Sequence, residues 1–363
     1  MGNLPEVSVF MPVYNGARYI KDAIKSILDQ SFYDLELIII DDGSTDNTSE
    51  IIKEINDKRI RFFSNDTNKG LPYTRNKGLK LCRGKYIAFM DADDISHQER
   101  IKTQICHFYQ HPYLDVISCT KENIPSKQIN PCNLVTREFT LPQKIELYFR
   151  RNLTNIYAPP NSSIMLLFRC MIVNPGSMIK KSFITKNNIR YRNEYFVAQD
   201  YSFWMDCMIK GANFKILQNP LLYYRTDDDY ESITNISKKF KSKERKKLIS
   251  SIRARGLKDT NIMDNSGELK AFNDFFQERK FIVDKSNVKL LKKTLKTLKI
   301  NNKIKNVFPS KNFNYVLQIN WINQIVNSPY LSRKQKLFTI FFSYWFSKNP
   351  KVYIYMLLRI VRS

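Results

Sequence analysis

The stretch that decides the fold is Gly84-Lys85-Tyr86-Ile87-Ala88-Phe89-Met90-Asp91-Ala92-Asp93-Asp94. Its apolar centre, Tyr86 to Met90, predicts a short buried strand. Carboxylates follow at once, and Asp91 and Asp93 stand one residue apart. In an extended turn such a pair can bind one hard divalent cation, because Mg²⁺ and Mn²⁺ prefer oxygen ligands. The stretch therefore predicts a strand that ends at a metal site; the plainer alternative is a solvated acidic turn.

A second acidic pair follows another apolar run. Residues 35–40 form an apolar run apart from Glu36, and Asp41-Asp42-Gly43-Ser44 closes the run. In open α/β sheets, ligands bind outside the carboxyl ends of the strands. We therefore expect both acidic groups to face one crevice. The alternative for this second segment is a capped turn, since Ser, Thr and Asp favour helix N-caps.

The rest of the N-terminal half alternates between strand and helix patterns. Further strands are predicted at residues 7–13, 60–64, 171–179 and 214–224. Helices are predicted at residues 17–30, 45–55, 71–82 and 201–209. Strands that alternate with helices of this length indicate the α/β class, with a parallel sheet covered by helices. Residues 115–170 give no clear pattern and are interpreted as a mixed region.

Several of these segments together resemble the motifs of family 2 glycosyltransferases of the bacterial surface-polysaccharide type. In chain order they are Pro12-Val13-Tyr14-Asn15, Asp41-Asp42-Gly43-Ser44-Thr45-Asp46, Asn68-Lys69-Gly70-Leu71 with Arg75-Asn76, residues 84–94, and Gln199-Asp200-Tyr201. The resemblance covers residue 5 to about residue 235. It implies the GT-A fold, a Rossmann-like and mostly parallel central sheet with flanking helices.

The resemblance also implies a role for each matching residue. The nucleotide site would contain Pro12, Val13 and Tyr14 around the base, Asp41 and Asp42 on the nucleoside, Arg75 near the nucleotide, and Asp91 with Ala92 at the ribose. Asp93 would bind Mn²⁺ or Mg²⁺ on the diphosphate, with Asp91 as a second ligand. Asp200 matches the family's general base.

These roles imply an inverting glycosyltransferase that uses a nucleotide-sugar donor. A divalent cation would stabilise the diphosphate leaving group, and a carboxylate would take the proton of the attacking hydroxyl. The expected donor is a UDP-hexose or a UDP-N-acetylhexosamine. The expected acceptor is a hydroxyl of a glycan or a lipid-linked acceptor in surface polysaccharide or lipooligosaccharide synthesis.

The sequence departs from the family pattern at three positions. Gln199 stands where the family usually has Glu, but the essential carboxylate of Asp200 is kept. Asn174 precedes Pro175 where His-Pro is common. Asp227 stands where many relatives have a histidine that helps to hold the metal. Asp227 is either a substitute oxygen ligand or part of an acidic loop, and both interpretations stay open.

Charge divides the chain into two regions. Residues 1–235 hold 30 Lys/Arg and 27 Asp/Glu, whereas residues 236–363 hold 29 Lys/Arg and 7 Asp/Glu. We therefore predict a glycosyltransferase domain at 1–235 and a basic, mainly helical region at 236–363. Such asymmetry points to a polyanionic partner, either nucleic acid or an anionic membrane face.

The C-terminal tail favours the membrane as that partner. Residues 334–362 mix aromatic and basic residues, which suits a helix in a bilayer interface; the alternative is a helical pair packed on the catalytic domain. With no secretory signal and no apolar span evident, we expect a cytoplasmic protein, peripheral on the inner face of the cell membrane. Six scattered cysteines without metal spacing agree with a reducing compartment.

Two other functions were weighed. A nucleic-acid-binding or nucleotidyl-transferring protein would explain the basic region, but that region has no recognisable nucleic-acid-reading motif. An inactive relative that serves as an assembly subunit would not need Asp91, Asp93 and Asp200. Oligomeric state cannot be predicted from these patterns.

Overall fold

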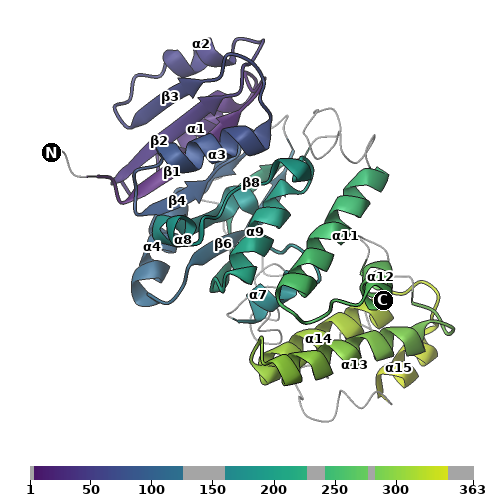
Figure 1. Ribbon diagram of the computed structural model, residues 1–363. Helices are drawn as coiled ribbons and strands as arrows, with labels where there is room; N and C mark the ends of the chain where they lie inside the picture. Colours follow the sequence, from purple (N-terminus) through teal and green to yellow (C-terminus); the bar gives the residue numbers. More distant parts are fainter. Residues whose placement is uncertain (1–3, 126–159, 227–241, 277–282, 342–363) are drawn as a thin grey trace. The chain divides into compact units, whose positions relative to one another are not determined.

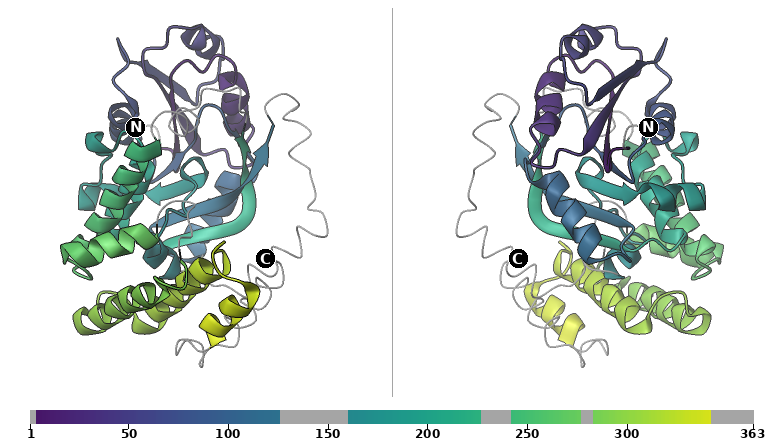
Figure 2. Two further views of the ribbon diagram at one scale, coloured as in Figure 1. Left: turned by 90° about the vertical axis from the view of Figure 1, so that its right-hand side faces the viewer. Right: turned by 90° about the vertical axis from the view of Figure 1, so that its left-hand side faces the viewer.

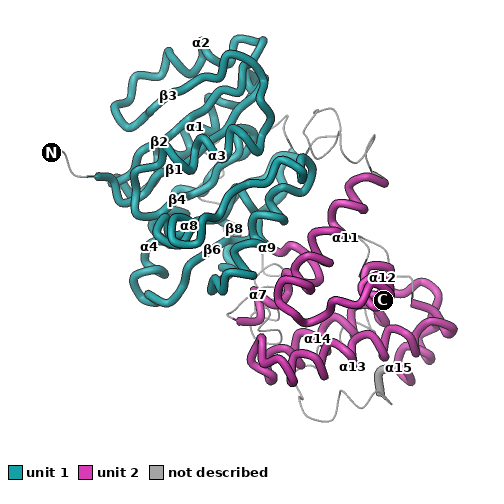
Figure 3. The backbone as a smooth tube through the Cα atoms, viewed as in Figure 1, with its two compact units in different colours: residues 1–138, 172–242 teal, residues 139–171, 243–363 magenta. Residues whose placement is uncertain are grey.

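The computed structural model describes residues 4–125, 160–226, 242–276 and 283–341 (Figure 1). The chain forms two compact units, residues 1–138 with 172–242 and residues 139–171 with 243–363 (Figure 3). The predicted boundary between residues 235 and 236 lies outside the described residues. Each unit is described by itself.

The first unit is built on an eight-stranded sheet with the order β3-β2-β1-β4-β7-β6-β8-β5. The strands are β1 (Val7–Val13), β2 (Leu35–Asp41), β3 (Ile60–Ser64), β4 (Tyr86–Phe89), β5 (Ile95–Ser96), β6 (Val116–Ile124), β7 (Ser177–Lys180) and β8 (Phe214–Arg225). The first four strands in this order are parallel, and β7 and β5 run antiparallel to their neighbours. The α/β prediction is confirmed, with a mixed half beside the parallel one.

Helices cover both faces of the parallel half. The unit contains α1 (Ile20–Leu28), α2 (Thr48–Lys53), α3 (Leu71–Leu81), α4 (Arg100–Gln110), α8 (Lys181–Asn187) and α9 (Gln199–Ile209). Alternate residues of β1, such as Val9 and Met11, share one core with α1, α2 and α4. Phe10 points to the other face, where a side chain on Gly78 of α3 would collide with its ring. The period of two along β1 thus sets the two layers of helices.

The register of the sheet ends β1 and β2 at the same level and β4 three residues earlier. Val13, the last residue of β1, pairs with Asp41 at the end of β2, and Phe10 pairs with Phe89 at the end of β4. The acidic residues that follow β2 and β4 therefore leave the sheet at the same edge. This is the arrangement expected for ligand binding in an open α/β sheet.

The sequence prediction fails between residues 171 and 179. Only β7, from Ser177, is a strand there, because a 3-10 helix at Asn174–Gly176 precedes it. Pro175 has no N–H to donate, so this segment cannot continue a strand ladder. The long strand β8 curves beside β6 with a register shift near Thr120 (Figure 2). The strand β6 falls in the region where no pattern was evident.

The second unit is helical in its described part. It contains α7 (Asn161–Met165), α11 (Ser242–Asp259), α12 (Ser266–Phe275), α13 (Val288–Lys305), α14 (Ser310–Val326) and α15 (Arg333–Phe341). The ring of Phe168 packs on Phe272 and Phe276, and Asn312 donates a hydrogen bond to Asn161. Residues 160–171 thus join the C-terminal helices, and the prediction of a basic helical region is confirmed.

No helix in the described part of the chain has both the length and the apolar character that crossing a bilayer requires. Most of the predicted aromatic tail, residues 342–362, lies outside the described residues. The five described cysteines are all free thiols.

Candidate active site

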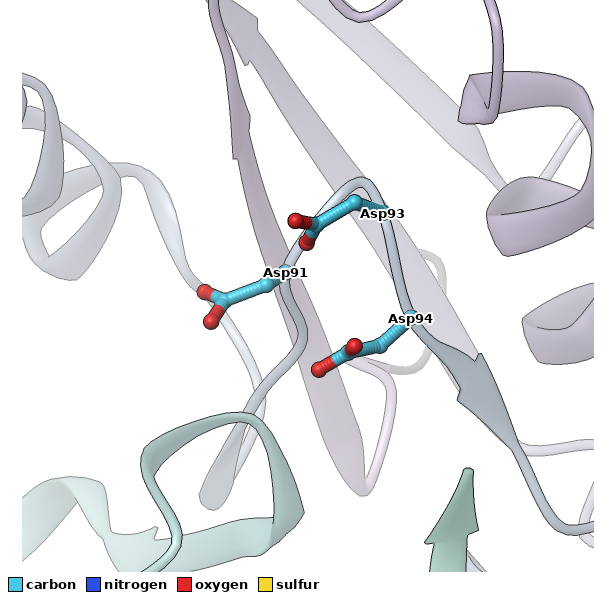
Figure 4. A group of neighbouring side chains, drawn as sticks. All are labelled: Asp91, Asp93 and Asp94. Carbon is cyan, nitrogen blue, oxygen red and sulfur yellow. The ribbon is translucent and has the colours of Figure 1, made fainter. Parts of the chain in front are cut away.

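Three carboxylates gather in the turn between β4 and β5. Asp91, Asp93 and Asp94 each offer an oxygen, and these oxygens all lie within 4.8 Å of one another (Figure 4). The turn is closed by the Asp94 N–H, which donates to the Asp91 carbonyl. Met90 donates its N–H to the Phe10 carbonyl, so the sheet fixes the start of the turn. Together these contacts hold the acidic cluster at the edge where ligands bind.

Burial and mutual repulsion make this cluster costly without a cation. Burial raises the pKa of Asp93 to about 7, and the neighbouring charge of Asp91 adds to the rise. Burial also raises the pKa of Asp91, and the negative charge of Asp200 adds to that rise. The pKa of Asp94 is raised by burial and by the negative charge of Asp93. Among the described residues, the buried Oδ2 of Asp94 has no hydrogen-bond partner. A hard divalent cation would satisfy these oxygens and remove the repulsion, so the residues fit such an ion.

Three cations partly offset the acidic charge. The Arg75 guanidinium lies 3.3 Å from an Asp91 oxygen, and the Arg225 N–H donates to Asp94 at 3.2 Å. Lys121 on β6 places its ammonium 3.0 Å from the ring centre of Tyr224 on β8. Burial raises the pKa values of all three aspartates, and the positive charge of Lys121 acts to lower them. The motif analysis identified Arg75 but missed Lys121 and Arg225.

The guanidinium of Arg225 is held in place by groups outside the acidic turn. Its guanidinium donates to Asp22 at 2.9 Å and lies 4.6 Å from the ring centre of Tyr19. Both partners belong to the start of α1 or precede it directly. Arg225 thus ties the end of β8 to α1 while its backbone supports Asp94. A pattern search cannot find this link, because 203 residues separate Arg225 from Asp22.

Asp200 lies in the first turn of α9, as predicted from its sequence neighbourhood. One carboxylate oxygen accepts a hydrogen bond from the Tyr201 N–H at 2.8 Å. Burial is the main cause of the raised pKa of Asp91, and the charge of Arg75 opposes it. The negative charge of Asp200 adds to the rise. Asp200 is therefore within electrostatic reach of the acidic cluster. The ring of Phe89, just before the cluster, packs edge-on against Phe203 and Trp204 of the same helix.

The residue before α9 has an unfavourable backbone conformation. Ala198 has φ 64° and ψ 28°, in the left-handed region, where a Cβ costs about 1–2 kcal/mol. We expect Ala198→Gly to raise the free energy of unfolding by about 0.5–1 kcal/mol, after allowing for the greater freedom of glycine in the unfolded chain. Urea denaturation would measure the change. The matched substitution Ala23→Gly, inside α1, should lower stability instead, and a loss of stability in Ala198→Gly would contradict the prediction.

Asp41 and Asp42 are buried and already engaged by the protein. Asp41 accepts hydrogen bonds from the N–H and hydroxyl of Ser44 and from the Ser49 hydroxyl. The donors to Asp42 are the Asn65 amide and the N–H groups of Lys69 and Gly70. In each carboxylate one oxygen has a single donor and keeps a lone pair. Both residues therefore brace the loops after β2 and β3.

The loop after β1 is tied to the loop after β2. The Asn15 side chain accepts a hydrogen bond from the Thr45 N–H, and Ser44 accepts one from the Asn15 N–H. Pro12 and Val13 are buried within β1, whereas Tyr14 is 47% exposed at its end. Of the three residues expected around the base, Tyr14 is the one with a freely accessible ring.

A buried arginine stabilises the acidic turn through hydrogen bonds to residues on either side of it. Arg100 is fully buried and donates to the carbonyls of Phe89 and Pro175 and to the Ser96 hydroxyl, at 3.0, 2.6 and 2.8 Å. Burial lowers its pKa to about 10. Arg100 thus clamps both ends of the turn that carries the aspartates. Sequence reasoning missed it because a single arginine at the start of a helix has no distinguishing pattern.

Three further positions were singled out in the sequence, namely Asp227, Ala92 and Asn174. Asp227 lies outside the described residues. Ala92 is half-buried between Asp91 and Asp93 in the acidic turn. Asn174 is buried, and neither polar atom of its side chain has a hydrogen-bond partner among the described residues.

Comparison with known proteins agrees with this geometry. The family model "Glycosyl transferase family 2" matches residues 8–173. The chain is also 30% identical over 238 residues to an uncharacterized glycosyltransferase, and the match covers 75% of that protein. The chain belongs to glycosyltransferase family 2.

That relative is the uncharacterized glycosyltransferase MJ1057 of Methanocaldococcus jannaschii, and the match covers 64% of the present chain. Chondroitin synthase of Escherichia coli is 35% identical over 154 residues, which are 42% of this chain and 21% of that enzyme. The chain thus matches only about a fifth of the length of chondroitin synthase. A crystal structure of S. aureus TarS (residues 1–349) in complex with UDP-GlcNAc has a TM-score of 0.54 at 18% identity. That match covers 87% of this chain and 90% of the other, and it supports the GT-A fold.

Proposed function

We propose that the chain is an inverting, metal-dependent glycosyltransferase with a UDP-hexose or UDP-N-acetylhexosamine donor. The acceptor is a hydroxyl of a glycan or a lipid-linked acceptor in surface polysaccharide or lipooligosaccharide synthesis. The observation that carries the proposal is the cluster of Asp91, Asp93 and Asp94 at the end of β4, with Asp200 in electrostatic reach. A cluster of this kind serves transfer from a diphosphate donor, in which negative charge develops on the leaving group.

The acidic turn is proposed to hold the cation and the ribose. Asp93 and Asp91 would be the metal ligands, and the unpartnered oxygen of Asp94 lies beside them. Mn²⁺ or Mg²⁺ bound there would offset the charge of the diphosphate as the bond to the sugar breaks. Asp227, two residues further along the chain than β8, remains a further candidate ligand. Arg75, paired with Asp91, would oppose the burial that raises the pKa of that carboxyl and would lie beside the nucleotide.

Asp200 is proposed as the general base. Its carboxylate lies in the first turn of α9, within electrostatic reach of the acidic turn. The acceptor hydroxyl would lose its proton to Asp200 as its oxygen attacks the anomeric carbon from the face opposite the diphosphate. One displacement of this kind inverts the anomeric configuration.

The loops after β1, β2 and β3 are proposed to hold the nucleoside. Tyr14 offers an exposed ring for the base, next to Pro12 and Val13. Asp41 and Asp42 brace these loops, and each keeps one lone pair through which it can accept a hydrogen bond from a base or a ribose. The complex of TarS with UDP-GlcNAc supports a UDP-sugar as donor, and the similarity to chondroitin synthase supports a glycan acceptor.

We place the protein in the cytoplasm, peripheral on the inner face of the membrane. Residues 236–363 hold 29 Lys/Arg against 7 Asp/Glu, a charge that an anionic lipid surface attracts. Lipid-linked acceptors are presented at such a surface. Nucleic acid is also a polyanion and would be attracted by the same charge. Membrane-binding assays therefore need a control for bound nucleic acid.

A panel of nucleotide sugars tests the proposed function directly. We expect one of UDP-galactose, UDP-glucose, their N-acetylamino forms or a dTDP-sugar to release its nucleoside diphosphate in the presence of Mn²⁺. Chelation of the metal should lower the rate by about 10²-fold or more, because the charge of the leaving group is then unshielded. Release of diphosphate from none of these donors would contradict the proposal, and a rate that chelation leaves unchanged would contradict its metal dependence.

A further inference from the structure

The helix α13 presents a continuous lysine face. It contains seven lysines and no acidic residue. At 100° per residue, six of them fall within a stripe about 120° wide and about 21 Å long, which we call the lysine stripe. Its members are Lys289, Lys292, Lys293, Lys296, Lys299 and Lys303. All of them are exposed except Lys299, which is half-buried.

The opposite face of α13 is fully used in packing. Leu291, Leu295 and Leu298 are buried, and the helix packs against α12 and α14 of the same unit. The orientation of the lysine stripe is therefore fixed by the core of the second unit. The stripe cannot turn inward without exposing those leucines.

A solvated face alone does not explain the stripe. Lysines three and four residues apart repel each other on a helix surface, and a mixture of Glu and Lys would be more stable. The stripe contains six such spacings, for example from Lys289 to Lys293 and from Lys292 to Lys296. The helix α13 contains no acidic residue that could pair with the stripe from within the helix. An anionic partner would turn this repulsion into attraction.

Exposed apolar side chains beside the stripe indicate what kind of partner it is. Ile300 is 46% exposed and Ile304 is 74% exposed, and both fall at the edge of the stripe on the helical wheel. In the first unit, by contrast, the exposed large apolar residues are mainly tyrosines. A polyanionic glycan or nucleic acid would engage the lysines and leave the isoleucines unused. A lipid headgroup region accommodates both kinds of side chain.

We propose that the lysine stripe of α13, with Ile300 and Ile304, is a docking surface for an anionic lipid membrane. The inference deepens the peripheral association in the proposed function and rests on that part of it alone. It assigns the contact to a described helix, in addition to the aromatic tail predicted from the sequence. Docking through α13 would hold the second unit at the surface where a lipid-linked acceptor is found.

Vesicle sedimentation of the full chain tests this docking surface. We expect binding to phosphatidylcholine vesicles that contain phosphatidylglycerol, and little binding to phosphatidylcholine alone. A variant with Lys289, Lys292, Lys293 and Lys296 changed to Gln should bind the anionic vesicles at least about tenfold more weakly. The matched control changes Lys21, Lys53, Lys58 and Lys80, four exposed lysines of the first unit, to Gln and should bind like the unchanged chain.

A second variant separates a membrane from a soluble polyanion. Ile300→Ser with Ile304→Ser should weaken vesicle binding several-fold but leave binding to heparin unchanged. Equal vesicle binding by the four-lysine variant and the unchanged chain would overturn the inference. So would failure of the unchanged chain to bind anionic vesicles while it binds heparin. Sugar transfer is not measured in this test, so its outcome is independent of whether the chain turns over a nucleotide sugar.

Discussion

Replacing Asp93 by Asn is expected to lower the rate of sugar transfer by about 10²- to 10³-fold and to remove its dependence on Mn²⁺. The substitution takes one charged oxygen ligand out of a cluster whose three carboxylates lie within 4.8 Å of one another. Initial rates measured over a Mn²⁺ titration would show the effect. Asp34→Asn, an equal change of charge at an exposed position just before β2, should leave both the rate and the metal dependence unchanged.

The same substitution has a pH signature in the metal-free protein. Burial, and then the charge of Asp91, raises the pKa of Asp93 from the ordinary 3.8 to about 7. Between these values the folded protein holds a proton that the unfolded chain has lost. Its stability should therefore fall as the pH rises from about 4 to about 7. Asp93→Asn should remove much of this fall, which thermal unfolding at several pH values would measure.

Metal binding competes with that proton. Mn²⁺ affinity should increase as the pH rises toward 7, because the carboxylate must be ionised to bind the ion. A metal affinity that is independent of pH in this range, or an Asp93→Asn enzyme that still responds to Mn²⁺, would show that the acidic turn is not the metal site.

Replacing Asp200 by Asn is expected to lower kcat by about 10²- to 10⁴-fold while donor binding persists, because only proton transfer from the acceptor is lost. The change also removes a negative charge that, after burial, helps to raise the pKa of Asp91. The same charge would attract a cation bound at the turn, so the two effects oppose each other and the Mn²⁺ affinity of the variant should stay within a few-fold of the unchanged value. A merely structural defect would weaken donor and metal binding together with kcat, so the combined measurements identify a base.

Asp206 on the same helix provides the control. It pairs with Arg192 at 2.8 Å and is thus a carboxylate of α9 with a structural partner. Asp206→Asn should lower stability and leave kcat within a few-fold of the unchanged value. If Asp200→Asn retained the full kcat, the assignment of the general base would be wrong.

The strands that could be predicted are those whose pattern is local. Runs such as residues 7–13 and 60–64 are apolar or β-branched, and the structure has strands at these positions. The prediction failed at residues 171–176, where Pro175 and the clamp by Arg100 impose a 3-10 turn on an apolar run. Tertiary contacts of this kind leave no trace in a window of ten residues.

The candidate site shows the same division. Motif order identified Asp91, Asp93 and Asp200, and the structure gathers the acidic turn and puts Asp200 in electrostatic reach. The supporting cations Lys121 and Arg225 come from strands that sheet topology alone brings beside the turn. Motif spacing says nothing about such neighbours, because their distance along the chain is set by loops of arbitrary length.

The short strand β5 has a consequence for how the site is assembled during synthesis. Among the described residues, Ile95 and Ser96 form strand pairs with Tyr223 and Leu222 of β8 alone, and the Arg225 backbone N–H donates to Asp94. A nascent chain that has emerged only as far as residue 173, where the family match ends, holds all three turn aspartates but lacks their anchor. The proposed site is thus completed only once residue 225 has been synthesised, and a minimal active fragment has to reach past that residue.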